Sequence, residues 1–425
     1  MYKSIVQWAA TYWSRLLLLT VPFGIAASKL GFSHSTVFIL NCIAIIPLAD
    51  VLCRATDDAS SFLGETSGAL LNITMGNVTE LVILYVGLPT SPTLLTFLDS
   101  VHALLQRQYT IVRTSLLGSS IVNILLVLGL SIVAGETRER GQMYNVVATR
   151  IAAGMLCLTS ISLIVPSTLR FSSDAATQTH DVLEISRAIS VVLVFIYFGY
   201  LWIQTASPRF SYKPLAEPHK EACAPEMVES TELHVPRDCR STYTQPHDPL
   251  IPTLELGSEL ALTLKSTPAK RASWLRKATP LFLLIVSTAL IFICGEVLVS
   301  SVDHVVDNSP ISKTMVGLVI LPIVGNAAEL ISGVMFALRG QMDLAFAVAI
   351  GSAVQIAMFV TPLVVLLGWG LGREMGFCFT GFERGVFGGS VVLFLVMGVG
   401  RRCGMVKGGL LLAGYIVIGY MAMLT

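Results

Sequence analysis

The chain has 425 residues, of which 54% are hydrophobic and only 13% are charged, and its formal net charge is +1. Soluble domains carry about 25% charged residues, so this composition argues against a soluble enzyme and indicates a polytopic membrane protein. Neither the net charge nor a basic cluster points to a nucleic-acid partner.

Hydrophobic stretches long enough to cross a bilayer recur along the chain. A membrane helix needs about 20 mostly apolar residues. This criterion predicts an all-α fold with eleven spans, at approximately 15–32, 36–53, 66–88, 113–134, 148–166, 187–205, 279–300, 314–338, 344–371, 386–400 and 407–424. We interpret the first as a retained helix rather than a signal peptide, because no convincing cleavage site follows it.

The central segment 207–277 differs in composition from the rest of the chain. It is rich in Pro, Glu, Ser, Thr and Lys, and such a composition cannot bury enough apolar surface to fold well alone. We expect a disordered loop here. It would separate an N-terminal segment with an extra helix (1–35) and a first group of five helices (36–206) from a second group of five (278–425).

Two groups of five helices must enter the membrane from opposite sides, because five is odd. They would therefore be inverted repeats, as in many secondary transporters. With a cytosolic N-terminus, eight Lys and Arg residues of short loops fall on the cytosolic side and six on the other. The positive-inside rule then places the N-terminus and the central loop in the cytosol.

One motif occurs in the second helix of each predicted repeat. Gly-Asn-Val-Thr-Glu at 76–80 recurs as Gly-Asn-Ala-Ala-Glu at 325–329, and the amide and the carboxylate of each copy share one helical face. A charge near the bilayer midplane costs roughly 2.5–3.5 kcal/mol. Two such acids in matching surroundings indicate an ion site between the repeats. The alternative is that the two glutamates form hydrogen bonds across a helix interface and have only a structural role.

The oxygen atoms of this motif suit a hard cation. Nearby glycine and proline loosen the helix and free backbone carbonyls, which protein or water must then satisfy. Calcium takes six to eight oxygen ligands, and no thiolate or imidazole favours a softer metal. The candidate metal ligands are Glu80, Glu329, Asn77 and Asn326.

The same carboxylates can hold protons. Burial and a second carboxylate nearby both favour the protonated form of an acid. A divalent cation must displace those protons in order to bind. A site that holds protons or the cation, but not both, is what an antiporter needs.

A second polar cluster follows each motif, Gly-Ser-Ser-Ile-Val-Asn at 118–123 and Gly-Ser-Ala-Val-Gln at 351–355. These side chains could supply oxygens or hold the glutamates, although Gly-Ser pairs also allow helices to pack closely. Glu296, inside the seventh span, could relay protons, or it could have only a packing role between helices. The supporting polar or proton-linked candidates are Ser119, Asn123, Ser352, Gln355 and Glu296.

These motifs resemble a known family. The stretch 63–80, with Gly-Ala-Leu-Leu-Asn before Gly-Asn-x-x-Glu, is similar to the first repeat of the CAX-type cation/proton exchangers, a branch of the calcium/cation antiporters. Segments 322–329 and 349–357 resemble the second repeat, and eleven spans with a hydrophilic loop after the sixth also fit. The resemblance implies a fungal-like vacuolar membrane protein that moves calcium out of the cytosol against protons, with Glu80 and Glu329 as central ligands.

We therefore predict an antiporter and not an enzyme. It would exchange a divalent cation, with Ca²⁺ favoured, for H⁺ by alternating access, with no cofactor and with the lipid bilayer as its surroundings. Exchange of Mn²⁺ for H⁺ or of Na⁺ for Ca²⁺ are alternatives among transporters, and a cation channel is the alternative from another class. No HExxH, GxSxG or phosphate-loop pattern supports a hydrolase or an ATP-driven pump.

Overall fold

The computed structural model describes residues 17–63, 98–169, 175–206, 268–370, 375–398, 400 and 402–425. The chain divides into two compact units, Met1–Pro214 with Thr279–Thr425, and Leu215–Ala278, and only the start of one helix is described in the second. Within the described residues the secondary structure is helical, apart from one isolated antiparallel bridge between Met143 and Arg402.

The first described elements are α2 (Thr20–Lys29) and α3 (His34–Leu63), which pack against each other. The turn between them uses Gly31, whose φ of 73° lies in the left-handed region that glycine adopts without strain. Buried Asn41 on α3 donates hydrogen bonds to the carbonyls of Gly24, at 3.0 Å, and Val37, at 2.8 Å. This side chain therefore fixes α3 against α2.

Two long helical rods carry the second polar cluster of each predicted repeat. The first consists of α6 (Leu98–Ile121), the π-helical turn η1 (Val122–Val127) and α7 (Leu128–Arg138). The second consists of α15 (Met342–Gln355), the π-helical turn η4 (Ile356–Val360) and α16 (Thr361–Gly370). Each rod changes to π-helical hydrogen bonding at the end of its polar cluster, and π-bulges are frequent at functional sites.

The region predicted as one span at 314–338 is a broken helix. It comprises α12 (Lys313–Met315), η3 (Val316–Ile320) and α13 (Leu321–Gly325), and then, after Asn326, α14 (Ala327–Leu338). The two halves are bent by 55° at the break. The prediction of a single helix needs this correction, because hydropathy measures only apolar length and does not detect a change of direction.

The remaining described helices are α8 (Val146–Leu169), α9 (Ala175–Ala206), α11 (Pro268–Asp307), α17 (Gly381–Met397) and α18 (Met405–Leu424). Seven helices in the described residues are long and apolar enough to span a membrane, or eight when the broken pair counts as one span. This agrees with a polytopic helical protein. The predicted span at 66–88 and most of the predicted loop at 207–277 lie outside the described residues.

Several observed helices are longer than their predicted spans. For example, α3 continues to Leu63 although the predicted span ends at 53, and α9 begins at Ala175 rather than at 187. Hydropathy locates the apolar centre of a span, whereas the backbone hydrogen bonds continue into more polar flanking turns.

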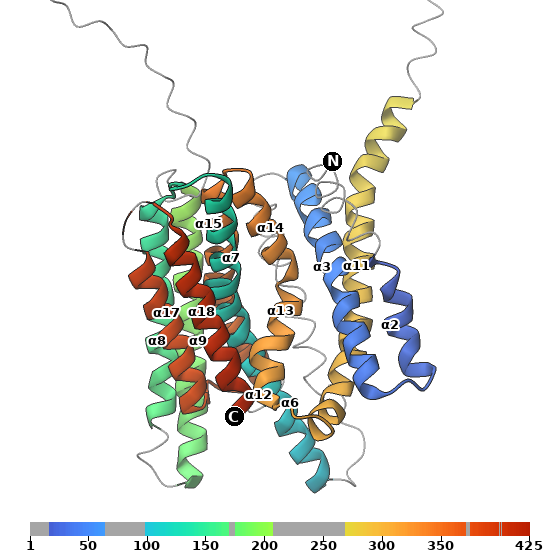
Figure 1. Cartoon of the computed structure of the whole chain (residues 1–425). Helices are drawn as coiled ribbons and strands as arrows, with labels where there is room; N and C mark the ends of the chain where they lie inside the picture. Colours follow the sequence, from blue (N-terminus) through green and yellow to red (C-terminus); the bar gives the residue numbers. More distant parts are fainter. Residues whose placement is uncertain are drawn as a thin grey trace, which may run out of the picture. The chain divides into compact units, whose positions relative to one another are not determined.

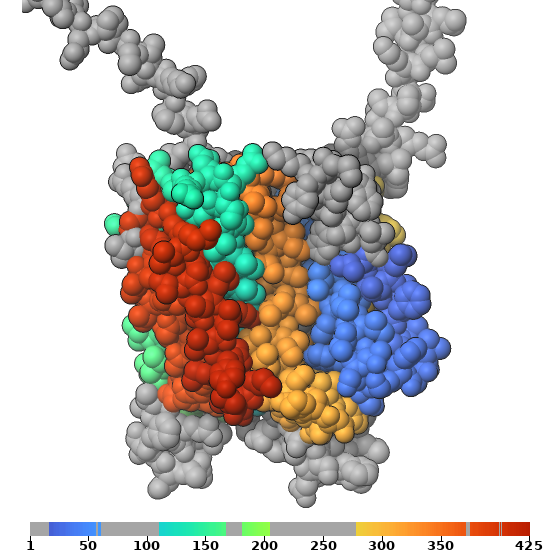
Figure 2. All heavy atoms as spheres, in the orientation of Figure 1, coloured from blue at the N-terminus to red at the C-terminus, as the bar shows by residue number. Residues whose placement is uncertain are grey.

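The broken helix lies inside the first unit. In Figure 1, α13 and α14 run between α3 and α7; α14 packs against both of these helices, and α13 packs against α3 and α6. Figure 2 shows α17 and α18, in red, covering one face of this unit beside the orange α13–α14 region. Large apolar side chains on the outer helices are exposed, including Phe195 and Trp202 on α9, Ile285 on α11 and Ile416 on α18. Such a surface suits a lipid environment.

Candidate cation site

The break in the second motif is built around Asn326. This residue has φ −96° and ψ 21°, stands at the N-cap of α14, and makes no side-chain cap. Instead its Nδ2 donates to the carbonyl of Pro322 at 2.8 Å, and its backbone N–H donates to the same carbonyl at 3.0 Å. Asn326 is therefore bonded to the end of α13, while Glu329 lies in the first turn of α14. The two residues sit across a break rather than within one regular helix, which corrects the prediction from their spacing.

Asn123, in η1, joins this break to the polar cluster of the first half. Its Nδ2 lies 2.6 Å from Asn326 Oδ1, 3.1 Å from the Ser119 carbonyl and 3.3 Å from Ser352 Oγ. Asn123 and Asn326 are both fully buried. We call these four residues the asparagine cluster: Asn123, Asn326, Ser119 and Ser352. Residues from both halves of the chain thus meet at one place.

Two oxygen atoms of the asparagine cluster are buried without a hydrogen-bond partner among the described residues. They are Asn123 Oδ1 and Ser119 Oγ. An unsatisfied buried polar atom costs about 1–3 kcal/mol, so such atoms are uncommon and need a reason. Oxygen atoms of this kind can act as ligands of a hard cation.

Glycine allows the two halves to approach. A Cβ atom added to Gly118 would lie 2.5 Å from the Leu318 carbonyl oxygen and 2.6 Å from Pro322 Cγ, and one added to Gly317 would lie 3.0 Å from Thr114 Cβ. The backbones of α6 and of η3–α13 therefore cross in direct contact. This crossing positions Asn123 opposite Asn326, so the packing and functional interpretations of the Gly-Ser pair are compatible.

The other predicted site residues have different positions. Glu329 on α14 and Gln355 on α15 are half-buried. Glu296 on α11 is exposed, and no hydrogen bond among the described residues joins it to the asparagine cluster. Glu80 and Asn77 lie outside the described residues. Where the structure describes the chain, it contains no group of three or more His, Cys, Asp or Glu side chains that could hold a metal ion.

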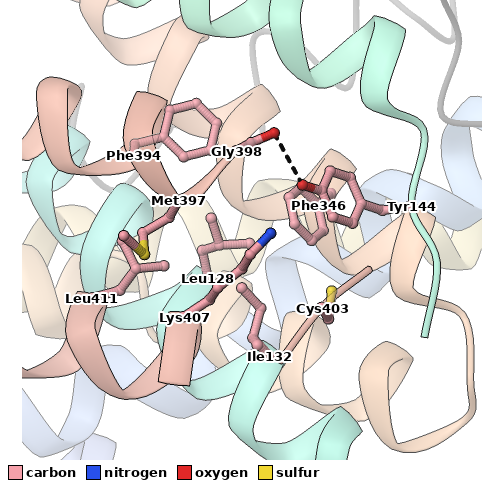
Figure 3. Close-up of a pocket in the computed structure, with 10 residues that line it drawn as sticks. All are labelled: Leu128, Ile132, Tyr144, Phe346, Phe394, Met397, Gly398, Cys403, Lys407 and Leu411. Carbon is pink, nitrogen blue, oxygen red and sulfur yellow. Dashed lines mark hydrogen bonds between the residues drawn. The ribbon is translucent and has the colours of Figure 1, made fainter. Parts of the chain in front are cut away.

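The loop after α7 contacts the loop after α17 through Gln142, Tyr144, Gly398, Gly400 and Cys403, and we call this contact the loop junction. Cys403 N–H donates to the Gln142 carbonyl at 2.9 Å, and Tyr144 Oη donates toward the carbonyls of Gly400, at 2.8 Å, and Gly398, at 3.2 Å. Figure 3 shows the small cavity beside this junction, whose volume of about 10 Å³ leaves room for no more than a water molecule. Its lining is mostly apolar, contains no carboxylate and includes the cation Lys407, so it does not offer the oxygen ligands that a hard cation requires.

Burial in this junction changes the acidity of two groups. It raises the pKa of the Cys403 thiol to about 12, and the negative charge of Glu136 acts in the same direction while Lys407 opposes it. Burial likewise raises the pKa of Tyr144 to about 12. Both groups are therefore neutral at physiological pH.

Sequence reasoning missed one buried acid, Glu383 in α17. It is 3% exposed, and it hydrogen-bonds with Thr114 on α6. The signal that could have found it is the capping box Thr380-x-x-Glu383 before an apolar helix.

Comparison with known proteins identifies the family of this chain. A family model described as sodium/calcium exchanger protein matches residues 34–206 and 279–424, the two regions that contribute to the asparagine cluster. The chain belongs to the sodium/calcium exchanger family. The predicted family resemblance is thereby confirmed. The interval between the two matched regions, 207–278, coincides with the compositionally distinct central segment.

Relatives of this exchanger include transporters from fungi and bacteria. A vacuolar calcium ion transporter of Schizosaccharomyces pombe is 33% identical over 398 residues, which are 93% of this chain and 78% of the relative. A Ca²⁺/H⁺ antiporter of Synechocystis sp. is 30% identical over 404 residues, 95% of each chain. A solved structure, native YfkE, covers 97% of this exchanger and all of its own chain with a TM-score of 0.70 at 23% identity, and so shows the shared fold.

Proposed function

We propose that this protein is a secondary antiporter that exchanges Ca²⁺ for H⁺ across a vacuolar membrane. The observation that carries the proposal is the asparagine cluster, where a helix break in the second half meets a π-helical turn of the first half through the 2.6 Å contact between Asn123 and Asn326. The vacuolar and Ca²⁺/H⁺ assignments are supported by the relatives from Schizosaccharomyces pombe and Synechocystis.

The chemistry of the cluster favours a hard cation. The half-helix Lys313–Gly325 ends at the cluster, and the last carbonyls of a helix carry partial negative charge. Amide and hydroxyl oxygens of Asn123 and Ser119 lie nearby without hydrogen-bond partners among the described residues. We assign Glu329 and Glu80 as the charged ligands, with Asn326 and Asn77 beside them, and Ser352, Gln355 and Glu296 as supporting polar or proton-linked residues.

Proton coupling follows from the two glutamates. When both carboxyls are protonated, the site is neutral and can remain in the membrane interior without a metal ion. Ca²⁺ binds to the carboxylates only when their protons leave, and protons that return release the ion. Exchange of one species for the other, with no state that holds both, couples the two fluxes.

Alternating access would use the two halves as inverted repeats, with segments 36–206 and 278–425 moving against each other around the site. The π-helical turns at the ends of both polar clusters, η1 and η4, support a matching architecture. The N-terminal segment 1–35 would stand outside the repeats. The N-terminus and the segment 207–277 would face the cytosol.

The proposal is tested by uptake of radiolabelled calcium into vesicles that carry the protein and an imposed pH gradient. We expect uptake that a protonophore abolishes and that both Glu329→Gln and Glu80→Gln eliminate. Glu139→Gln, in an exposed loop position, is the matched control and should keep wild-type uptake. Substantial uptake by both site variants would reject the assignment of the ligands.

The same vesicles separate the alternatives. Uptake driven by a sodium gradient at constant pH would show a Na⁺/Ca²⁺ exchanger instead. Flux that needs no counter-gradient would show a channel. Preferential uptake of manganese in competition with calcium would replace Ca²⁺ by Mn²⁺ as the cargo.

A further inference from the structure

A cavity separate from the proposed cation site lies between α3 and α11. Its volume is about 440 Å³, and Leu18, just before α2, completes its wall. Small-molecule sites commonly measure about 300–1,000 Å³ and combine apolar walls with a few polar groups. The described residues that line the cavity include no member of the asparagine cluster, so it is a distinct place in the molecule.

The cavity lies near one membrane boundary. In Figure 1, α3 and α11 run beside each other, and buried residues of both belong to one apolar cluster. His34, which starts α3, stacks on His304 near the end of α11, with the ring centroids 3.9 Å apart. The two helices are therefore antiparallel. The lining residues, within 48–58 on α3 and 283–290 on α11, lie towards the other end of both spans.

One wall of the cavity carries charge. Asp50, Arg54 and Asp58 follow one another at four-residue intervals, so they share one face of α3. Arg54 Nε donates to Asp50 Oδ1 at 3.1 Å, and its terminal NH₂ groups have no acceptor among the described residues. Asp50 Oδ2 is buried and has no hydrogen-bond partner there. The wall therefore offers a guanidinium that can bind an anion and a carboxylate oxygen that lacks a donor.

The facing wall is apolar. Leu283, Val286 and Leu290 recur at intervals of three and four residues, so they form one face of α11 towards the cavity. The neighbouring side chains of Phe282 and Ile285 are 65% and 66% exposed, as on a surface that contacts lipid. The cavity thus has a charged wall and an apolar wall, which suits an amphiphilic ligand.

This lining does not suit a metal ion. A hard cation needs six to eight oxygen ligands, whereas most of the lining is apolar. The guanidinium of Arg54 also stands between the two carboxylates in the sequence of the charged wall, and it would repel a cation.

We infer that this cavity binds a phospholipid with an ethanolamine headgroup, with its phosphate on Arg54, its ammonium beside Asp50 and Asp58, and an acyl chain along α11. Two acids and one arginine complement a headgroup that carries both an anion and a cation, whereas an anionic headgroup would meet an excess of carboxylates. A primary ammonium can also donate to Asp50 Oδ2, but the quaternary ammonium of choline has no N–H.

A lipid in this place would act on the helices around the proposed cation site. The helix α3 packs against α13 and α14, the two halves of the broken helix. Leu321 and Val324 of α13 belong to the same buried cluster as residues of α3 and α11. A lipid between α3 and α11, at the end away from the histidine stack, would therefore stabilise the helix on which the break packs. Lipid binding itself does not depend on the proposed function.

Native mass spectrometry of the purified, delipidated full-length protein tests the inference. We expect dioleoyl phosphatidylethanolamine to bind at least about tenfold more tightly than the phosphatidylcholine and phosphatidylglycerol with the same chains. Arg54→Ala should weaken binding of the ethanolamine lipid about tenfold, and Asp50→Asn should remove most of its advantage over the choline lipid. Asp303→Asn is the matched control, because it removes an acid paired with Lys313 at 3.4 Å outside the cavity, and it should bind as wild type does.

A second pair of variants leaves the charges in place. Val286→Phe fills the apolar part of the cavity and should weaken binding of the ethanolamine lipid about tenfold or more. Ile285→Phe adds a ring at the adjacent exposed position and should bind as wild type does. Thermal melting establishes that each variant is folded. The inference is overturned if wild type binds the choline or the glycerol lipid as tightly as the ethanolamine lipid. It is equally overturned if folded Arg54→Ala or folded Val286→Phe binds the ethanolamine lipid with wild-type affinity.

Failure of the proposed function has a different signature. Wild-type vesicles would then show no calcium uptake driven by the pH gradient, whichever phospholipid the purified protein binds. The two outcomes are therefore distinguishable.

Discussion

At the scale of single residues, the proposed cation site would depend on amides as much as on acids. Asn123 uses its NH₂ group to join Asn326, Ser119 and Ser352, and Asn326 in turn bonds to the end of α13. Amides keep their hydrogen bonds whatever the pH. They can therefore hold the geometry of the site while neighbouring carboxyls exchange protons for a cation.

We predict that Asn123→Ala lowers both stability and transport. Loss of the amide leaves the Asn326 oxygen without its partner, which should cost about 1–3 kcal/mol and raise the calcium KM of uptake. Asn41→Ala is the control matched for burial: it also removes a buried asparagine with two hydrogen bonds, but on the α2–α3 pair. Melting temperatures should fall for both variants, and KM should rise for Asn123→Ala alone. Unchanged KM in the folded Asn123→Ala protein would contradict this role.

Cys403 should resist alkylation in the folded protein. Only the thiolate reacts, and with a pKa of about 12 the thiolate fraction at pH 8 is about 1 in 10⁴, rising only as the pH approaches 12. Mass spectrometry after iodoacetamide treatment at pH 8 should find Cys403 modified only after unfolding. Cys378, half-exposed in the segment before α17, should react faster in the folded state. Rapid native labelling of Cys403 would mean that the loop junction opens in solution.

At the scale of elements, the crossing of α6 with η3 decides whether the site forms. Two helices approach this closely only where side chains are absent, and Gly118 and Gly317 provide that space. The end of α13 and the start of α14, on either side of the helix break, can then both lie beside the asparagine cluster.

Gly118→Ala should disrupt this crossing. Its Cβ would meet backbone and a rigid proline ring, neither of which can move aside, so overpacking should cost about 1–3 kcal/mol and calcium uptake should fall at least about tenfold. Gly351→Ala, at the corresponding place in the second cluster, has open space within 4 Å and should transport normally. Equal uptake by the two variants would show that the close crossing is not required.

At the scale of the whole molecule, cation and protons should compete for one folded state. A ligand that binds only the folded protein stabilises it by about 2.7 kcal/mol at one hundred times its Kd. Protons occupy the carboxylates at low pH, so the stabilisation by calcium should be larger at pH 8 than at pH 6. Melting curves with and without calcium at the two pH values measure this. Glu329→Gln should lose the calcium shift, and a shift that grows on acidification would exclude competition.

The membrane character, most of the spans, the repeated acid-and-amide motif and the family could be predicted from the sequence. Apolar length and local spacing are properties of residues that are neighbours in the sequence, so they can be recognised without knowledge of the fold. For that reason the polar clusters at 118–123 and 351–355 can be recognised as candidates without knowledge of any contact.

Only the tertiary structure decided which of these candidates meet. Asn123 and Asn326 are 203 positions apart, and Thr114 and Glu383 are 269 apart, so no local pattern connects them. Their contacts depend on how closely two helices can cross and on where a third one bends. Those features arise from the absence of a Cβ at Gly118 and from the hydrogen bonds that Asn326 makes to Pro322 instead of capping α14. The physical reason is that packing is a property of surfaces brought together from distant segments, whereas hydropathy and spacing describe each segment alone.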